Sequence, residues 1–276
     1  MAFWAQEATY EDLQECVRVE RETMGDYTYL SDVWDYYFAT PGAVVCVFDG
    51  DVMAGIGRIS VLPDNTGWLE CLRVAPDYQN KGAGKLIYQN YLEIARRHGC
   101  HSLGMFTGPT NARSAGLAQK FGLTETHKHF EFSLPVSGGG SPHGFAPVTW
   151  QRAKQLVLPL VDQYHGFYTF NRTFYRINAD TAAAFANEGK VYEDKTTGSF
   201  IVCGGRFQHH KCLHIAMMDG DFAACVDFAK NLAAAQNIPR ISVSVCGDNP
   251  RLTTALKNLG FTPSEGYLIT KTGPVK

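Results

Sequence analysis

Apolar residues recur at helical and strand spacings along the first half of the chain. Thr9 is placed to cap a first helix, residues 49–51 (Asp-Gly-Asp) give a hairpin signal, and Gly99 ends a second helix. The predicted elements are helices over residues 10–22 and 84–98 and strands over residues 43–48, 52–62 and 68–74. This alternation favours an α/β or α+β layer fold.

The second half repeats the first. Residues 111–123 read as a short helix that ends at a glycine, and residues 249–261 carry Asn, Arg and Gly at the same offsets, 138 positions later. A stretch rich in glycine, proline and serine lies between the halves and is expected to be a linker. The predicted organisation is a first domain over 1–134, a linker over 135–147 and a second domain over 148–276.

Composition narrows the class of protein. With 276 residues, 45% hydrophobic and 19% charged, the chain is long and apolar enough for two globular domains. A net charge of −2 gives no basic field for nucleic acid. No apolar run is long enough to cross a membrane and no leader is evident, so a cytoplasmic protein is expected. The eight dispersed cysteines are expected to be small buried hydrophobes.

The segment with the clearest chemistry joins the strand at 68–74 to the helix at 84–98. Glycines at 82 and 84 follow Pro76, so the turn leaves backbone N–H groups unpaired at the start of a helix. Such a turn favours a phosphate or pyrophosphate ligand. It is neither a P-loop nor a dinucleotide fingerprint. The alternative is an ordinary strand-to-helix turn that needs glycine for its backbone angles.

The pattern Gln79-x-x-Gly82-x-Gly84 after a Leu-x-Val-x-Pro strand closely resembles the GNAT superfamily of N-acetyltransferases. Asn111, with the helix that ends Phe121-Gly122, resembles a second motif of that family, and the likeness covers residues 3–134. The resemblance implies tandem GNAT folds, each a mixed central sheet flanked by helices, and acetyl-CoA as co-substrate. It implies no metal.

By the same resemblance, one stretch of strand, turn and helix holds acetyl-CoA together with the start of the next helix. The residues expected to bind it are Leu72, Arg73, Val74, Gln79, Asn80, Lys81, Gly82, Ala83, Gly84, Lys85, Asn111 and Ser114.

The repeat itself limits the number of such sites. Residues 213–221 align with 69–77 at an offset of 144, whereas the offset downstream is 138, so the second half lacks six residues. The segment from Gln79 to Gly84 is six residues long. One acetyl-CoA site is therefore predicted, and the second half is expected to be a non-catalytic copy that shapes the acceptor pocket.

Acetyl transfer to an amine needs a base, because an alkyl ammonium group is protonated at neutral pH. Glu70 is the predicted base, since strand alternation places it on the side of Leu72 and Val74. A purely structural pairing of Glu70 with Arg58 or Arg73 is an equal alternative. Backbone N–H groups around Val74 are expected to stabilise the oxyanion.

The general acid is left open. Many family members place a tyrosine seven residues after the motif asparagine, where this chain has Ala118. Three alternatives remain: the CoA thiolate leaves unaided, Ser114 or Tyr88 supplies the proton, or catalysis is weak.

Four other features each have a structural interpretation and a functional one. Arg113 is a phosphate contact or, as its counterpart Arg251 suggests, structural, and His127 and His129 are surface residues or line an acceptor pocket. A zinc site is a weak alternative for the strand with His210, Cys212 and His214. The aromatic segment 164–175 forms an acceptor pocket, a dimer surface or core packing.

The resulting hypothesis is an N-acetyltransferase that acts on a primary amine of a small molecule or amino acid. The alternatives are an acyl-CoA sensor without turnover and an α/β protein without affinity for CoA. Neither nucleic acid nor membrane is an expected partner, and a homodimer is compatible with the sequence.

Overall fold

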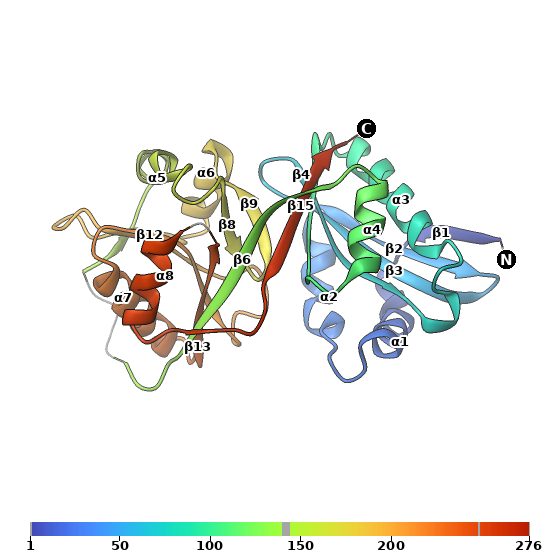
Figure 1. The fold of residues 1–276 in the computed structure, drawn as a ribbon, viewed down its shortest axis with the longest axis horizontal. Helices are drawn as coiled ribbons and strands as arrows, with labels where there is room; N and C mark the ends of the chain where they lie inside the picture. The colour runs from blue at the N-terminus through green and yellow to red at the C-terminus, as the bar shows by residue number, and fades with distance from the viewer. Residues whose placement is uncertain (1, 140–143, 248, 276) are drawn as a thin grey trace. The chain divides into compact units, whose positions relative to one another are not determined.

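The computed structural model describes residues 2–139, 144–247 and 249–275, which divide into two compact units. Unit 1 contains residues 2–126 and 271–275, and unit 2 contains the described residues between 127 and 270. Each unit is a sheet flanked by helices, which confirms the expected fold class (Figure 1).

In the sheet of unit 1 the first four strands pair antiparallel, and the fifth pairs with the fourth in parallel. Its strands lie in the order β1 (Phe3–Glu7), β2 (Gly42–Asp49), β3 (Val52–Val61), β4 (Thr66–Val74) and β5 (Ser102–Thr107). The helices are α1 (Leu13–Met24), α2 (Leu30–Ala39), α3 (Ala83–Arg97) and α4 (Ala112–Lys120). β4 and β5 pair in parallel, because α3 carries the chain back across the sheet between them.

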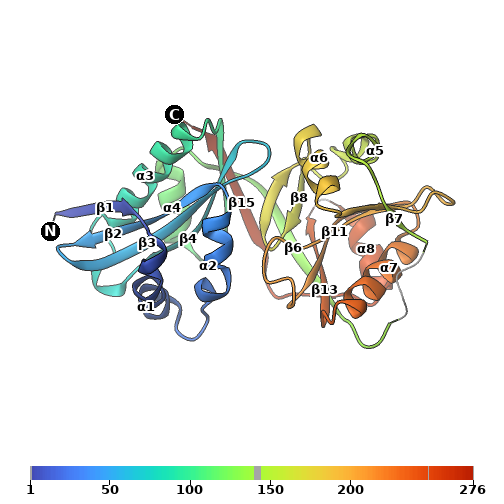
Figure 2. The ribbon, with the colours of Figure 1, turned by 180° about the vertical axis from the view of Figure 1, so that it is seen from behind.

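Helices cover both faces of this sheet. Gly57 of β3 faces α3, and a Cβ atom there would lie 2.0 Å from the hydroxyl of Tyr91. This close approach packs α3 against β2, β3 and β4 (Figure 1). The opposite face lies under α1 and α2 (Figure 2). It carries Arg58, whose guanidinium stands 5.1 Å from the ring centre of Tyr37.

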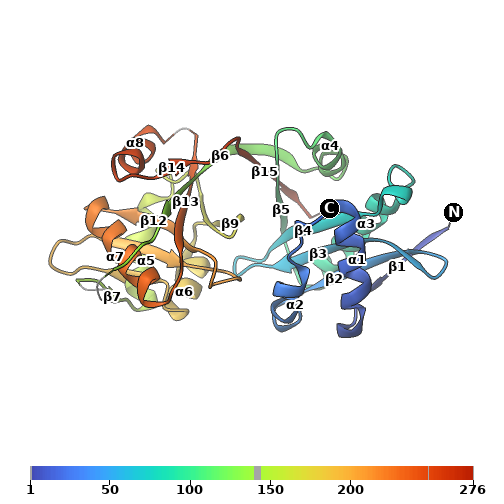
Figure 3. The same ribbon diagram turned by 90° about the horizontal axis from the view of Figure 1, so that it is seen from below.

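Unit 2 is built in a similar way. β6 (Thr124–Pro135) enters it and pairs antiparallel with β13 (Arg240–Cys246) (Figure 3). The sheet continues through β12 (Leu213–Asp219), β11 (Phe200–Gly204), β10 (Val191–Glu193) and β7 (Ala146–Pro147). Its helices are α5 (Trp150–Val157), α6 (Ala179–Asn187), α7 (Phe222–Ala235) and α8 (Pro250–Asn258). A hairpin of β8 (Phe167–Phe170) and β9 (Thr173–Arg176) and the short strand β14 (Thr262–Pro263) complete it.

The unit boundary differs from the predicted one. Residues 127–134 belong to unit 2, because β6 pairs with β13 over that stretch. Residues 271–275, the end of β15 (Leu268–Pro274) and the residue after it, belong to unit 1, where Val275 N donates to His101 O at 3.1 Å. Of the predicted linker 135–147, residues 140–143 lie outside the described residues.

All eight cysteines are buried and reduced, which confirms their predicted role as small hydrophobes. Within the described ranges no helix combines the length and the apolar character needed to span a bilayer.

Candidate active site

A β-bulge shapes β4 at the centre of the candidate site. Glu70 pairs with Arg58 and Arg73 with Ile56, so Cys71 and Leu72 together oppose one residue of β3. Cys71 adopts a left-handed backbone, with φ of 56°. Pairing of β4 with β5 is limited to three residue pairs and ends at Trp68. The edge of β4 beyond Trp68 therefore has no ladder with β5.

The predicted turn and helix lie directly after this edge. Gly82 is the N-cap of α3 with φ of 108°, a conformation that a residue with a side chain rarely adopts. No side chain among the described residues caps this helix. The N–H groups of its first turn are therefore free for an anion, with the exposed Lys81 and Lys85 on either side.

The start of α4 lies against this loop. Asn111 caps α4 by accepting a hydrogen bond from Ser114 N at 3.1 Å, which leaves the Asn111 amide nitrogen without a partner among the described residues. Arg113 donates to the side chain of Gln79, so its contact is structural. Gly84 lets α4 approach, because a Cβ atom there would stand 3.2 Å from Leu117.

The backbone N–H and C=O of Val74 face the unpaired edge of β4. Ala75 N donates to Ala54 O at 2.9 Å, and antiparallel ladders alternate, so the N–H and C=O of Val74 point away from β3. The Gln79 side chain donates to Val74 O at 3.0 Å. The Val74 N–H is left as the donor on this edge.

Glu70 lies on the other face from the one that alternation predicted. The bulge shifts the phase of β4, so Leu72 and Val74 pack with the core under α3 while Glu70 faces α1 and α2. Its carboxylate accepts a hydrogen bond from Ser60 Oγ at 2.7 Å, and Ser60 in turn accepts one from Arg58 at 3.1 Å. Ser60 therefore links Glu70 to Arg58, one of the two arginines considered as its structural partner.

The motif position of the general acid, Ala118, and one of its two predicted substitutes, Tyr88, are both buried. Ala118 is buried in the core of unit 1. Tyr88 is also buried there, stacked on Phe121 at 4.8 Å, and burial raises its pKa. The Cys71 thiol lies on the site strand, but burial raises its pKa to about 12, so it stays protonated at neutral pH.

Unit 2 lacks this turn, and one of its own side chains caps the following helix. β12 ends at Asp219 and α7 begins at Phe222, so Gly220 and Asp221 alone replace the eight residues 75–82 of unit 1. The Asp221 carboxylate caps α7 by accepting hydrogen bonds from Ala223 N at 2.9 Å and Ala224 N at 3.1 Å. A carboxylate of the chain thus occupies the helix terminus that is open in unit 1.

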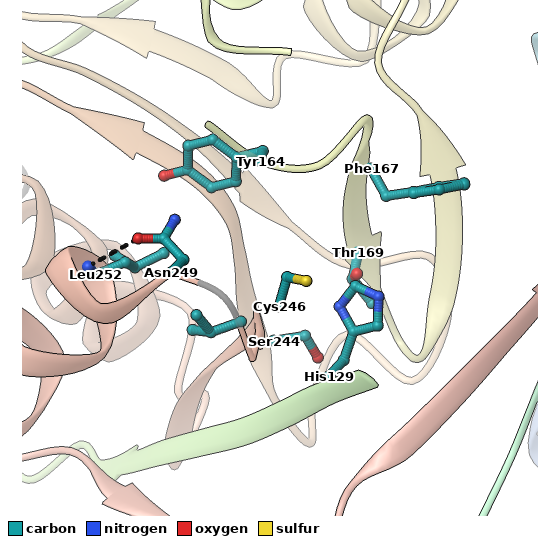
Figure 4. Close-up of a pocket in the computed structure, with 9 residues that line it drawn as sticks. His129, Tyr164, Phe167, Thr169, Ser244, Cys246, Asn249 and Leu252 are labelled. Carbon is teal, nitrogen blue, oxygen red and sulfur yellow. Dashed lines mark hydrogen bonds between the residues drawn. The ribbon is translucent and has the colours of Figure 1, made fainter. Parts of the chain in front are cut away.

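A side chain also fills the strand edge of unit 2. Met218, the counterpart of Val74, donates from its N–H to Tyr164 Oη at 3.0 Å and accepts from the same hydroxyl at 2.7 Å. Asn249, the counterpart of Asn111, donates to Gln163 O at 3.0 Å. Figure 4 shows Tyr164 and Asn249 beside a small cavity that Cys246 also lines.

The sequence indicates one of these internal contacts but not the other. Asp221 at a helix start is a recognisable capping signal. Nothing in the sequence pairs Tyr164 with Met218, which lies 54 residues later.

The predicted zinc strand is not one strand, because His214 lies on β12 whereas His210 and Cys212 precede it. His214, the counterpart of Glu70, shares a hydrogen bond of 2.8 Å with Ser242 through Nδ1, and Cys212 donates to the same hydroxyl. In the part of the chain that the structure describes, no three His, Cys, Asp or Glu side chains are grouped to hold a metal ion.

Of the two placements predicted for His129, a surface position is wrong, because the residue is 3% exposed, next to Phe174. Burial, with His127 and His165 nearby, lowers its pKa to about 3. The His129 imidazole takes up a proton near pH 6.5 in the unfolded chain but only near pH 3 in the folded chain. The free energy of unfolding therefore falls as pH drops from 6.5 toward 3.

We expect the replacement His129→Phe to flatten the acid dependence of unfolding, by up to about 1.4 kcal/mol per pH unit. Urea unfolding between pH 7 and pH 4 measures the effect, and His210→Phe at an exposed position is the control. An unchanged slope for His129→Phe would assign the acid loss to other groups.

The aromatic segment 164–175 is mainly core. Tyr168, Phe170 and Tyr175 pack around Phe185 of α6, with ring centres 5.0 to 5.1 Å apart. Of the predicted roles, core packing fits this placement.

Comparison with known proteins supports the architecture. Residues 7–123 match the family model described as Acetyltransferase (GNAT) family. Over 62 residues, 22% of this chain, the sequence is 37% identical to YedL, an uncharacterized N-acetyltransferase of Escherichia coli K12. That match spans 39% of the YedL sequence.

Two solved structures resemble the whole chain. A GCN5-related N-acetyltransferase from Sphaerobacter thermophilus has a TM-score of 0.65 at 11% identity, covering 99% of this chain and 96% of that one. A tandem GNAT protein from the clavulanic acid biosynthesis pathway has a TM-score of 0.60 at 14% identity, covering 100% and 99%. At these identities the matches show the fold alone, and the family model confirms the resemblance of the first half.

Proposed function

Because residues 7–123 match the family model of GNAT acetyltransferases, we propose that the chain transfers an acetyl group from acetyl-CoA to a primary amine of a small molecule. The reaction takes place at one site, in unit 1. The observation that carries this proposal is the uncapped N-terminus of α3 at Gly82, whose counterpart in unit 2 is closed by Asp221.

The residues around Gly82 fit the pyrophosphate of acetyl-CoA. Free N–H groups at the start of α3 and the flanking lysines favour an anion, and Gly82 lets it approach the backbone. The unpaired edge of β4 and the Asn111 amide then receive the amide-bearing arm, as the side chains of Tyr164 and Asn249 engage polar groups in unit 2.

Acetyl-CoA supplies an activated thioester. The amine nitrogen forms a bond to the acetyl carbon, the carbon–sulfur bond breaks, and CoA leaves as a thiolate. Glu70 takes the proton that the amine loses, directly or through water, and the Val74 N–H stabilises the oxyanion. No side chain is assigned as general acid, and a thiolate needs little help to leave.

A titration with acetyl-CoA, followed by an assay of CoA thiol release with a panel of amines, tests this function. We expect one site per chain and thiol release that depends on the amine. Binding without thiol release would favour the acyl-CoA sensor. Two sites per chain would contradict the capping of α7 by Asp221, which leaves no open helix terminus for the anion in unit 2.

The closure of unit 2 predicts a stability effect of its own. We expect Tyr164→Phe to lower the free energy of unfolding of unit 2 by about 1–3 kcal/mol, because the N–H and C=O of Met218 lose their partner in a buried place. Denaturant unfolding measures it. Tyr192→Phe is the matched control, since the Tyr192 hydroxyl bonds none of the described residues. Equal effects for the two would remove the hydroxyl of Tyr164 as the cause.

A further inference from the structure

The guanidinium of Arg73 has an unusual environment. Arg73 is half-buried on the face of β4 that lies under α1 and α2, and it donates to Leu72 O at 3.0 Å. Its Nε is buried without an acceptor, and none of the described carboxylates lies within ion-pair distance. Because a buried cation is costly without a partner, a guanidinium with free donors points to an anion that comes from outside the chain.

Glu20 of α1 has a carboxylate oxygen that lacks a hydrogen-bond donor among the described residues. It is fully buried, and its Oε2 accepts hydrogen bonds from Tyr29 N at 3.2 Å and Leu30 N at 3.1 Å. Its Oε1 has no partner among the described residues. Burial raises the pKa of Glu20, and the charge of Arg73 opposes that rise. This face therefore holds one donor without an acceptor, the Arg73 Nε, and one acceptor without a donor, the Glu20 Oε1.

The same face carries the proposed base. Because of the bulge at Cys71, Glu70 and Arg73 lie on one side of β4. A ligand group held by Arg73 is thus beside the place where Glu70 takes a proton. The second arginine of this face, Arg58, is already directed to the carbonyl oxygens of Thr40 and Pro41 and to Ser60.

We infer that the acceptor is an amino acid or another amine that carries a carboxylate near its nitrogen, and that Arg73 binds this carboxylate. The inference rests on the proposed function. A guanidinium matches a carboxylate with two parallel hydrogen bonds. The Arg73 guanidinium beside the buried Glu20 suits one negative charge better than a phosphate dianion. Arg73 is thereby assigned to the acceptor, whereas the sequence resemblance placed it with acetyl-CoA.

Matched pairs of acceptors test this inference. The probes are the α-amino acids and their carboxamides, each with acetyl-CoA, and the readout is kcat/KM for CoA thiol release. We expect the best acid to exceed its amide by about 10-fold or more. Arg73→Gln should lower kcat/KM for that acid by about 10- to 100-fold, mostly through KM, and leave the amide nearly unchanged. Arg73→Lys should recover part of the loss.

Two controls separate the inference from the proposed function. Arg21→Gln removes an exposed arginine of α1 and should change neither substrate. Acetyl-CoA affinity should be the same in Arg73→Gln as in the unchanged chain, which also reports that unit 1 is folded.

Three results would overturn the inference while acetyl transfer stands: amides used as well as acids, no α-amino acid used although other amines are, or equal losses for acid and amide in Arg73→Gln. A loss of acetyl-CoA affinity in Arg73→Gln would also overturn it and return Arg73 to the donor site. Absence of acetyl-CoA binding in the unchanged chain would instead reject the proposed function.

Discussion

Replacing Gly82 with aspartate is expected to lower the affinity for acetyl-CoA by about 100-fold or more. Gly82 has φ of 108°, so any side chain strains the turn, at a cost of about 1–3 kcal/mol. The new carboxylate would also cap α3 and repel the pyrophosphate, as the Asp221 carboxylate already caps α7 in unit 2. Calorimetric titration with acetyl-CoA measures the loss.

Gly99→Asp is the matched control for this experiment. Gly99 follows the other end of α3, also has positive φ, and has open space around its Cα. The control adds the same charge to unit 1 and should keep the original affinity. If Gly82→Asp binds acetyl-CoA as tightly as this control, the turn is not the pyrophosphate site.

Replacing Glu70 with glutamine is expected to lower kcat by about 10²- to 10⁴-fold near neutral pH. At pH 7 an alkyl amine is almost fully protonated and needs the carboxylate to accept its proton. As pH rises toward 10 the free amine becomes abundant, so the rates of the variant and the unchanged enzyme should converge. A pH–rate profile of both proteins measures this convergence.

The alternative is that Glu70 only supports the chain from Arg58 through Ser60. That role predicts a loss of the same size at every pH, together with lower stability. Acetyl-CoA affinity and the denaturation midpoint of Glu70→Gln should remain unchanged if Glu70 is the base. A profile that runs parallel to that of the unchanged enzyme would assign Glu70 to structure.

Local signals explain what the sequence predicted well. The turn at Gly82, α3 and the cap at Asn111 depend on neighbouring residues, so their patterns are readable in the chain. The bulge at Cys71 is different, because a left-handed cysteine in an apolar strand has no sequence signature. Simple alternation without this bulge places Glu70 on the face of Leu72 and Val74, so the predicted face was wrong.

Long-range contacts explain the other differences. The loss of the turn in the second half was visible as a change of offset in the repeat. The place of Tyr164 on β12 depends on packing between distant segments, which apolar periodicity does not encode. The same holds for residues 271–275, which resemble any strand that closes the domain before it.

The return of the C-terminal strand to unit 1 has a consequence for how the protein is made. Residues 2–126 leave the ribosome well before residues 271–275, which complete their unit. Unit 1 therefore reaches its final form only after unit 2 has been synthesised. A shortened gene that stops at the linker would produce this unit with one sheet edge left open, exposed to pairing with other chains.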